Sequence, residues 1–246
     1  MINLKATIAY DGTRYTGFQS QKNTDYTIQA KLEEVLTDVL GEKIEIIASG
    51  RTDAGVHAMG QVINFRTSTE MPLPKLMNKI NFALPNDIVF KKLKKESDRF
   101  HARYNVASKV YLFRILNSDV PNPFLRKYTY FYPHELNIEL MQKAAEEFVG
   151  THDFCAFSNA KKTKKSTVRT IHNIEVKKMN NEVQILVHGD GFLYNMVRII
   201  IGTLLEVSEG KKNIRDIQTI FASGKRADSG YMLPPQGLFL YEVFYK

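Results

Sequence analysis

The 246 residues of the sequence are enough for one large hydrophobic core or two smaller ones packed together, and a hydrophobic fraction of 43% is typical of a folded protein. The 34 lysines and arginines outnumber the 26 acidic residues, so the net charge of +8 favours a polyanionic partner. The single cysteine, Cys155, excludes an intramolecular disulfide and a zinc site built from several thiolates.

Capping residues and apolar periodicity predict the elements of the first hundred residues. Thr27 is an N-cap and Gly41 a C-terminal stop for one amphipathic helix, while Pro72 and Pro74 open a second helix. The predicted elements are a strand at 3–10, a helix at 28–40, strands at 43–49 and 61–67, a helix at 72–82 and a strand from residue 87 onward.

The rest of the chain predicts a comparable set of elements. Pro121 and Pro123 break the chain after a strand, and Asn180-Asn181 is typical of a hairpin turn. The predicted elements are a strand at 103–116, a helix at 135–149, strands at 168–178 and 182–189, helices at 192–207 and 213–222, and a closing strand at 237–245. The order β-α-β-β-α-β, followed by a similar set, predicts an α+β fold with mainly antiparallel sheet.

No segment directs the chain to a membrane or to export. Met1 is followed by residues of a strand, not by the charged, apolar and small-residue regions of a signal peptide. The most apolar stretch, 192–207, is interrupted by Asn195, Arg198 and Glu206 and is too short and polar to span a bilayer. We therefore expect a cytoplasmic protein that does not associate with membranes.

The loop between the strands at 43–49 and 61–67 has the composition of a site. Residues 50–57 read Gly-Arg-Thr-Asp-Ala-Gly-Val-His. In an extended stretch Arg51 and Asp53 point to the same side, and His57 can join them. The glycines allow a ligand to approach the backbone closely. An Asx-turn between two strands would use the same residue types, and spacing alone does not separate the two interpretations.

Arg198 is the second candidate, because it lies in a helix whose composition predicts burial. A buried guanidinium requires an anionic partner and hydrogen bonds. Asn195, Arg198 and Glu206 share one helix face. Asp53 is the partner that would explain both charged residues, and Glu206, two turns further along the helix, is the alternative.

Other chemistries have little support. Tyr111 lies on a strand between apolar neighbours, where a core tyrosine is the common outcome. Asp53 and His57 are four residues apart, but two ligands without a further cluster do not predict a metal site. The sequence also lacks the phosphate-binding loop of NTPases, a dinucleotide fingerprint and the Gly-x-Ser-x-Gly elbow. We expect neither a metal nor a cofactor.

Two lysine runs concentrate the positive charge. The run at 91–95 predicts either a strand edge protected by lysines or a contact with phosphates. The second run lies in a polar stretch at 158–166, which predicts a loop that either closes over RNA or is simply solvated. Its members are Lys161, Lys162, Lys164 and Lys165.

Motifs along nearly the whole chain resemble the TruA-type tRNA pseudouridine synthases. The most specific is the segment 50–58, which is similar to the catalytic signature of that family. One departure is Met232-Leu233, where the family has a smaller residue ahead of the prolines. The other matching segments, in the order of the family, are 10–21 with 27–29, 100–103, 109–115, 150–154, 168–171, 192–198 and 235–238.

The resemblance implies roles for individual residues. Asp53 corresponds to the catalytic aspartate, and Arg51 corresponds to the arginine that helps to extrude the target nucleotide. Tyr111 would stack on the flipped uracil and relay or block a proton. Arg198 corresponds to the basic residue paired with the aspartate, and Leu238 to an apolar residue of the pocket.

The resemblance also implies the architecture and the partners. Two similar, mainly antiparallel α/β halves, 1–102 and 103–246, would form a pseudouridine synthase core with a central active-site cleft. Such an isomerase acts on uridines at positions 38 to 40 of the tRNA anticodon stem-loop, as a homodimer and without cofactor or essential metal. We expect His57 and the four lysines of the 158–166 loop to contribute to RNA binding.

Two other functions fit part of the sequence. A non-catalytic RNA-binding protein would use the sheets and the basic loops and would not require an acid at residue 53. A metal-dependent nuclease or phosphoesterase would use Asp53 and His57, but the sequence lacks the additional carboxylates that such sites need.

Overall fold

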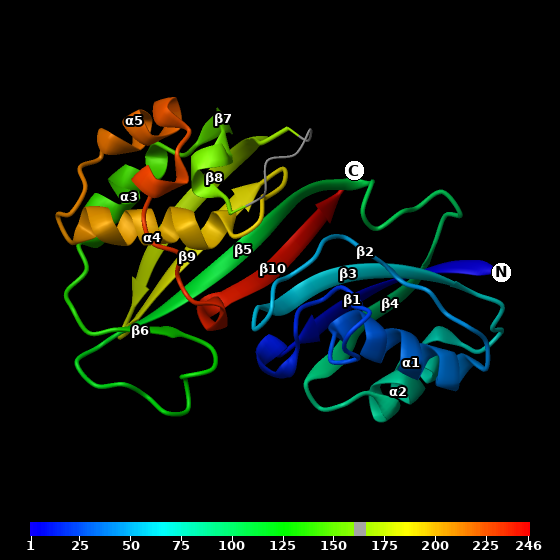
Figure 1. Ribbon diagram of the computed structural model, residues 1–246. Helices are drawn as coiled ribbons and strands as arrows, with labels where there is room; N and C mark the ends of the chain where they lie inside the picture. The colour runs from blue at the N-terminus through cyan, green and yellow to red at the C-terminus, as the bar shows by residue number, and fades with distance from the viewer. Residues whose placement is uncertain (160–165) are drawn as a thin grey trace. The chain divides into compact units, whose positions relative to one another are not determined.

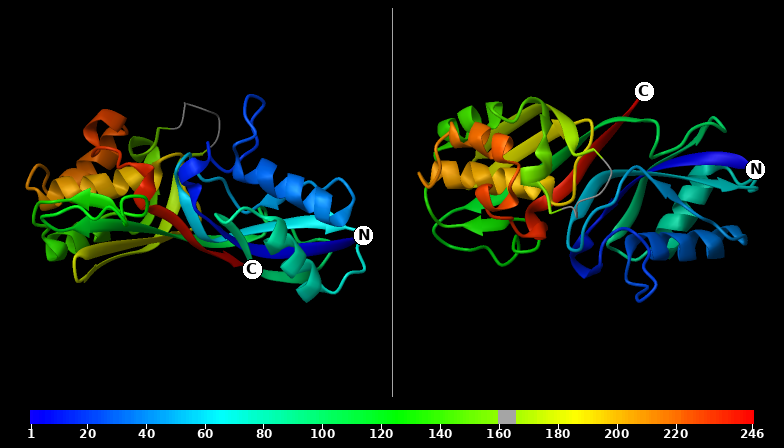
Figure 2. Two further views of the ribbon diagram at one scale, coloured as in Figure 1. Left: turned by 90° about the horizontal axis from the view of Figure 1, so that it is seen from below. Right: turned by 45° about the horizontal axis from the view of Figure 1, so that its top comes forward.

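The computed structural model describes residues 1–159 and 166–246 (Figure 1). The chain forms two compact units, the first made of Met1–Ala107 with Phe239–Lys246 and the second of Ser108–Leu238. Strands and helices occur in both units (Figure 2), which confirms the mixed, mainly antiparallel α/β class. Division into the functional halves 1–102 and 103–246 remains a prediction. None of the helices in the described ranges has the length and apolarity needed to cross a membrane.

In the first unit the strands follow the order β4-β1-β3-β10, and the short β2 also pairs with β3. All pairs are antiparallel except β10 with β3, where Phe239 lies opposite His57 in a parallel register. The elements are β1 (Ile2–Tyr10), α1 (Ile28–Leu40), β2 (Ile47–Ala48), β3 (His57–Thr67), α2 (Leu73–Ala83), β4 (Ile88–Glu96) and β10 (Leu238–Tyr245). The core contains fully buried side chains of β1, α1 and α2, namely Leu4, Ala6, Ile8, Leu32, Leu36, Leu76 and Ile80.

The ends of the first helix confirm the capping residues expected from the sequence. Thr27 precedes α1 and its Oγ1 accepts a hydrogen bond from the N–H of Ala30 at 3.2 Å. Gly41 ends the helix with φ of 69°, in the left-handed region that glycine adopts without cost. The lysine run at 91–95 lies on β4, at the edge of the strand order, and its four lysines are exposed. An edge strand with this many lysines resists pairing with another chain.

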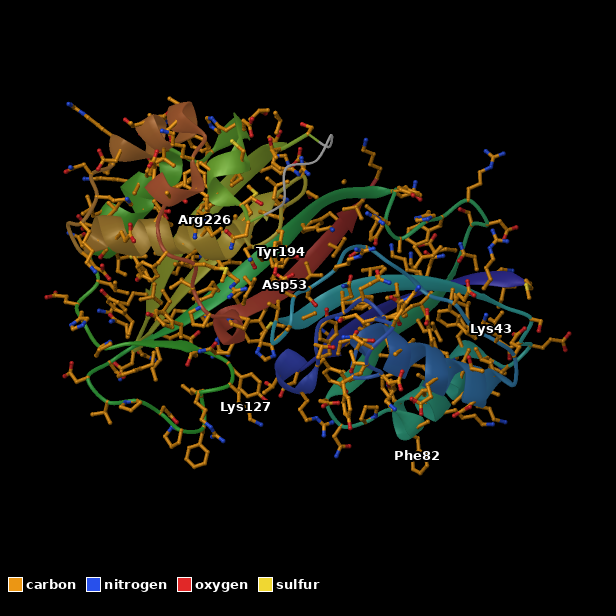
Figure 3. All side chains as sticks on the ribbon, in the orientation of Figure 1. Lys43, Asp53, Phe82, Lys127, Tyr194 and Arg226 are labelled. Atoms are coloured by element: carbon orange, nitrogen blue, oxygen red, sulfur yellow. The ribbon has the colours of Figure 1, made fainter. Side chains whose placement is uncertain are left out.

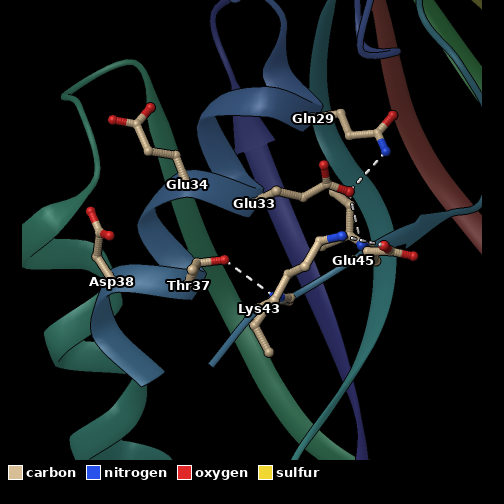
Figure 4. A pocket seen from close by; sticks show the side chains of 9 residues that line it. Gln29, Glu33, Glu34, Thr37, Asp38, Lys43 and Glu45 are labelled. Carbon is tan, nitrogen blue, oxygen red and sulfur yellow. Dashed lines mark hydrogen bonds and ion pairs between the residues drawn. The ribbon is translucent and has the colours of Figure 1, made fainter. Parts of the chain in front are cut away.

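The strand predicted at 43–49 is wrong for most of its length, because β2 has two residues. The N–H of Ile44 donates to Oγ1 of Thr37 at 3.2 Å, and the N–H of Ile46 donates to Oε1 of Glu33 at 3.0 Å (Figure 4). Both acceptors are side chains of α1. In the first part of this segment the backbone therefore bonds to side chains of a helix, and only its end pairs with β3.

In the second unit the strands follow the order β5-β9-β8-β7 in antiparallel pairs, and β6 pairs with β5 in parallel. Helix α3 packs against β8 and against α4, which is buried along almost its whole length. The elements are β5 (Val106–Asn117), β6 (Tyr130–Tyr132), α3 (Ile138–Glu146), β7 (Gly150–Asp153), β8 (Val168–Met179), β9 (Glu182–Gly189), α4 (Met196–Ser208) and α5 (Asp216–Ser223).

The three predicted helices of this unit begin later than the sequence suggested, and α5 starts at Asp216 where residue 213 was expected. Helix α3 begins after Asn137, whose Oδ1 accepts from the N–H of Leu140 at 2.9 Å. Helix α4 begins after Asn195, whose φ of 63° lies in the left-handed region and cannot continue a helix backward. The hairpin at Asn180 is confirmed, with φ of 55° at that residue. The four-residue strand β7 was not predicted.

Replacing the N-cap of α3 tests where this helix begins. We expect Asn137→Ala to lower the free energy of unfolding by about 1 kcal/mol, because the N–H of Leu140 loses its acceptor. Urea unfolding followed by circular dichroism measures the change. Asn137→Asp keeps the acceptor and is the control. If the helix began at residue 135, position 137 would lie inside it and the alanine would stabilise the protein.

Candidate active site

Loop 50–56 of the first unit holds Asp53 between β2 and β3. The Asp53 side chain is half-buried, and Arg51, two residues earlier, is exposed. Thr52 between them is buried, and its Oγ1 lies 2.7 Å from the hydroxyl of Tyr10. Burial raises the pKa of Tyr10, so this hydroxyl stays protonated and keeps the hydrogen bond. The carbonyl of Asp53 accepts from the N–H of Val56 at 3.1 Å, which closes a turn. The backbone on both sides of Asp53 is therefore fixed.

The segment after β1 packs tightly against this loop. The N–H of Phe18 donates to the carbonyl of Thr52 at 3.0 Å. A Cβ on Gly12 would lie 2.0 Å from the carbonyl oxygen of Val56, and Gly17 has φ of 114° with its Cβ position 3.1 Å from the carbonyl oxygen of Thr52. Only glycine fits at these two positions. The opening motif at 10–21 thus forms the wall that shapes the Asp53 loop.

His57 lies at the start of β3 and only 1% of its surface is exposed. Its Nδ1 accepts from the N–H of Gly12 at 3.0 Å and lies 3.1 Å from Oδ1 of Asp11. The imidazole stacks on Phe239 of β10, with ring centroids 4.7 Å apart. These contacts favour a role in holding the loop over direct contact with RNA, for which the sequence had suggested this histidine. An RNA contact by His57 remains a prediction.

Tyr111 lies on β5 in the second unit. It is opposite Val187 of β9, and 9% of its surface is exposed. The edge of its ring meets Phe192, with centroids 5.1 Å apart and an interplanar angle of 84°. An edge-to-face contact of this kind fixes the plane of the tyrosine ring. The ring is thereby oriented by a residue of the segment that leads into α4.

Arg198 lies in the first turn of α4 and is 7% exposed. Its Nε donates to the carbonyl of Leu233 at 2.5 Å, and its Nη1 donates to Oδ1 of Asn195 at 3.0 Å. The alternative partner suggested by the sequence, Glu206, accepts from the N–H of Tyr231 at 3.2 Å and pairs with a lysine of the following loop. Two neutral acceptors therefore hold the buried guanidinium in one direction.

Leu238 follows a short 3-10 helix, Pro235–Gly237, and is 6% exposed. Upstream of it, the two residues that depart from the family pattern have different environments. Leu233 is fully buried and supplies the carbonyl for Arg198, whereas Met232 is 39% exposed. The departure at Leu233 thus falls on a side chain of the core, while the contact with Arg198 uses the backbone.

The predicted site residues divide between the units. The first unit carries Arg51, Asp53 and His57 on one loop, and the second carries Tyr111, Arg198 and Leu238. The four lysines of the second run, Lys161, Lys162, Lys164 and Lys165, lie outside the described residues. In the part of the chain that the structure describes, no three His, Cys, Asp or Glu side chains are grouped so that they could hold a metal ion.

Three residues that contact the predicted site residues or their loop were not predicted to do so: Tyr10, Gly12 and Asn195. Tyr10 and Gly12, which fix the Asp53 loop, belong to the opening motif but have no signal of this contact in the sequence, because they lie about 40 residues before the loop. Asn195 was expected on the same face as Arg198 but was not named as its hydrogen-bond partner. The spacing of three residues would have identified it as a hydrogen-bond partner.

Comparison with known proteins gives one consistent result. A family model described as tRNA pseudouridine synthase matches residues 6–105 and 144–246. The chain is 48% identical over 240 residues to tRNA pseudouridine synthase A of Bacillus sp. (strain KSM-64), covering 98% of both chains. It is 45% identical over 245 residues to the protein of that name from Acetivibrio thermocellus, and 47% identical over 247 residues to tRNA pseudouridine synthase A 1 of Clostridium tetani, covering 100% of both chains in each case.

A solved structure titled as a Cbf5-Nop10-Gar1 complex aligns with 82% of this chain and 45% of its own chain, at 14% identity and a TM-score of 0.38, which is too weak to support a statement about this protein. The family model covers more than half of the chain, and the relatives match it over nearly its whole length. The chain belongs to the tRNA pseudouridine synthase family.

Proposed function

We propose that the chain isomerises uridine to pseudouridine in tRNA, at positions 38, 39 and 40 of the anticodon stem-loop. The observation that carries the proposal is the fixed loop 50–56, which presents the half-buried Asp53 next to the exposed Arg51. The name of the relatives states a pseudouridine-forming activity on tRNA. The net charge of +8 suits an RNA substrate. The alternative, a non-catalytic RNA-binding protein, has no support in the comparisons.

The reaction needs a carboxylate and no external reactant. The N1–C1′ bond of the uridine breaks, the uracil turns, and a C5–C1′ bond forms in its place. The hydrogen on C5 leaves as a proton and N1 gains one, so the atoms balance without an oxidant or reductant. Asp53 acts as nucleophile or base, by attack at C1′ or C6 or by removal of the 2′ proton.

The target base must leave its stack before the reaction, which costs a few kcal/mol. In the proposal Arg51 occupies the vacated space, and Tyr111 stacks on the flipped uracil. Arg198 favours the ionised form of Asp53, and Leu238 lines the pocket.

The remaining assignments rest on the resemblance to the family. We propose a homodimer that acts in the cytoplasm, where a tRNA substrate is available. His57 and the lysines of the 158–166 loop are proposed to contribute to RNA binding, with His57 acting through the loop that it holds.

Replacing the carboxylate of Asp53 tests the activity directly. Asp53→Asn keeps the size of the side chain but removes the nucleophile or base, so we expect conversion to fall on the order of 10³-fold or more while tRNA binding is kept. The measurement is tritium release from tRNA transcribed with 5-tritiated uridine, in the presence of EDTA.

Release by the unsubstituted protein alone supports metal-independent isomerisation through Asp53. Undiminished release by the Asn variant would contradict the proposal. Binding of tRNA without release by either protein would favour the non-catalytic alternative.

Arg198 should matter for stability as well as for activity. We expect Arg198→Ala to lower the free energy of unfolding by about 3 kcal/mol, because the buried carbonyl of Leu233 and the amide of Asn195 lose a charged donor. Urea unfolding measures the loss, and tritium release under conditions where the variant is folded should also fall. Arg198→Lys keeps the charge but cannot reach both acceptors. Its free energy of unfolding should therefore lie between those of the unsubstituted protein and Arg198→Ala. A variant as stable as the unsubstituted protein would show that these hydrogen bonds contribute little.

A further inference from the structure

An exposed aromatic side chain lies on a fixed backbone just before α4. Tyr194 has 55% of its surface exposed, although its neighbours in the sequence from Asn195 onward are buried. Its carbonyl accepts from the hydroxyl of Ser158 at 3.0 Å and from the N–H of Asn159 at 3.2 Å. Two consecutive residues therefore hold the carbonyl of Tyr194, while more than half of its surface is exposed.

Arg226 is hydrogen-bonded to the same segment through Asn159. Arg226 opens a short 3-10 helix, and its Nε donates to Oδ1 of Asn159 at 3.1 Å. Its Nη1 donates to Oγ of Ser229 at 2.9 Å and to the carbonyl of Gly230 at 3.0 Å. Figure 3 labels both Tyr194 and Arg226, which belong to the second unit. Through Asn159, the guanidinium and the tyrosine are parts of one hydrogen-bonded cluster.

The hydrogen-bond acceptors that hold the guanidinium of Arg226 are all neutral. Among residues 1–159 and 166–246, no Asp or Glu forms an ion pair with Arg226, and its Nη2 makes no hydrogen bond. Burial lowers the pKa of Arg226, and the charge of Glu206 acts in the opposite direction. A guanidinium nevertheless stays protonated in proteins. Arg114 shows the contrast, since its Nε and Nη2 donate to the carboxylate of Glu182 at 2.8 and 2.7 Å.

A fixed guanidinium of this kind matches a phosphate. Its orientation is set by neutral acceptors, so it loses little conformational entropy on binding, and its free N–H groups suit the oxygens of a phosphodiester. Tyr194, whose carbonyl accepts from the N–H of the same Asn159, has an exposed ring on which a base can stack. Positive charge combined with an aromatic ring is typical of contacts with single-stranded or unpaired nucleotides.

We propose that Arg226 and Tyr194 form a contact site for the RNA backbone, in which the guanidinium binds a phosphodiester and the ring stacks on an adjacent unpaired nucleotide. The inference rests on the proposed function, because it takes tRNA as the ligand. The site is connected to the buried arginine of α4, since Tyr194 directly precedes Asn195 and the amide of Asn159 donates to Sδ of Met232 at 3.4 Å. Binding of RNA at this site would thus contact segments that also hold Arg198.

The test compares a change of charge with a change of shape at residue 226. Arg226→Gln removes the charge, whereas Arg226→Lys keeps the charge and loses the forked geometry. Both variants lose the hydrogen bonds to Asn159, Ser229 and Gly230. Lys177→Gln is the matched control, because it changes the net charge equally in the same unit but removes a lysine already paired with Glu175 at 2.8 Å. The dissociation constant for unmodified tRNA is measured at several salt concentrations, together with the melting temperature of each variant.

We expect Arg226→Gln to make the negative slope of log Ka for tRNA against log salt concentration shallower by about one. It should also weaken tRNA binding about tenfold at 0.1 M salt. Arg226→Lys should keep the slope, and Lys177→Gln should leave both quantities unchanged. For the ring, Tyr194→Phe should bind as the unsubstituted protein does, while Tyr194→Ala should weaken binding about tenfold with an unchanged slope.

Equal effects of Gln and Lys at residue 226, accompanied by a lower melting temperature, would overturn the inference in favour of a purely structural role. An unchanged slope in Arg226→Gln would also overturn it. If the unsubstituted protein bound tRNA but released no tritium, the proposed function would be wrong. The salt dependence of tRNA binding would still show whether Arg226 contacts a phosphate.

Discussion

The guanidinium of Arg198 is a charge inside the second unit, and a buried charge must have hydrogen-bond partners in fixed places. Its partners come from two directions. Asn195 reaches it from the turn just before α4, and the carbonyl of Leu233 reaches it from 35 residues further along the chain. Asn195 meets the guanidinium from a left-handed conformation, and Leu233 meets it through its backbone. The proposed pocket residue Leu238 lies only five residues beyond that anchored carbonyl.

In the first unit, the short polar loop at 50–56 has a fixed backbone although its Asp53 is only half-buried. Close backbone packing fixes it. Glycine at residue 12 lets the chain approach the carbonyl of Val56, and the hydroxyl of Tyr10 holds Thr52. His57 then joins the turn at Asp11 to β3. Asp53 itself is half-buried, and the contacts of its neighbours fix the loop. Preorganisation of this kind is what a catalytic group requires.

Local signals in the sequence predicted the elements that depend on local physics. Thr27 and Gly41 bound α1 as expected, and Asn180 forms the expected hairpin, because caps and turns depend on a few adjacent residues. The segment 43–49 has the alternation of a strand, but the N–H groups of Ile44 and Ile46 donate to side chains of α1. That choice between a neighbouring strand and a neighbouring helix is made by tertiary packing. The sequence alone therefore could not decide it.

The residues of the candidate site could be predicted from the sequence, but the hydrogen-bond partners that hold them could not. Asp53 and Arg198 stood out because a carboxylate among glycines and an arginine among isoleucines are unusual. The contact from Arg198 to Leu233 uses a backbone carbonyl, which every residue possesses, so no side-chain pattern could indicate it. The same holds for the carbonyl of Thr52, which accepts from Phe18. Spacing rules detect partners within one helix or strand, and these partners are distant in sequence.

Strand β10 has a consequence for the order in which the chain becomes folded. It pairs with β3 of the first unit, although the whole second unit lies between them in the sequence. A nascent chain can therefore form β1, α1, β3, α2 and β4 early, but His57 gains its stacking partner Phe239 only after residues 108–238 have been synthesised. Until then one side of β3 lacks its parallel neighbour, and an unpaired strand edge is prone to non-native association. The turn that carries Asp53 thus reaches its final support only after Phe239 has been synthesised, which places the completion of the proposed catalytic loop after synthesis of the second unit.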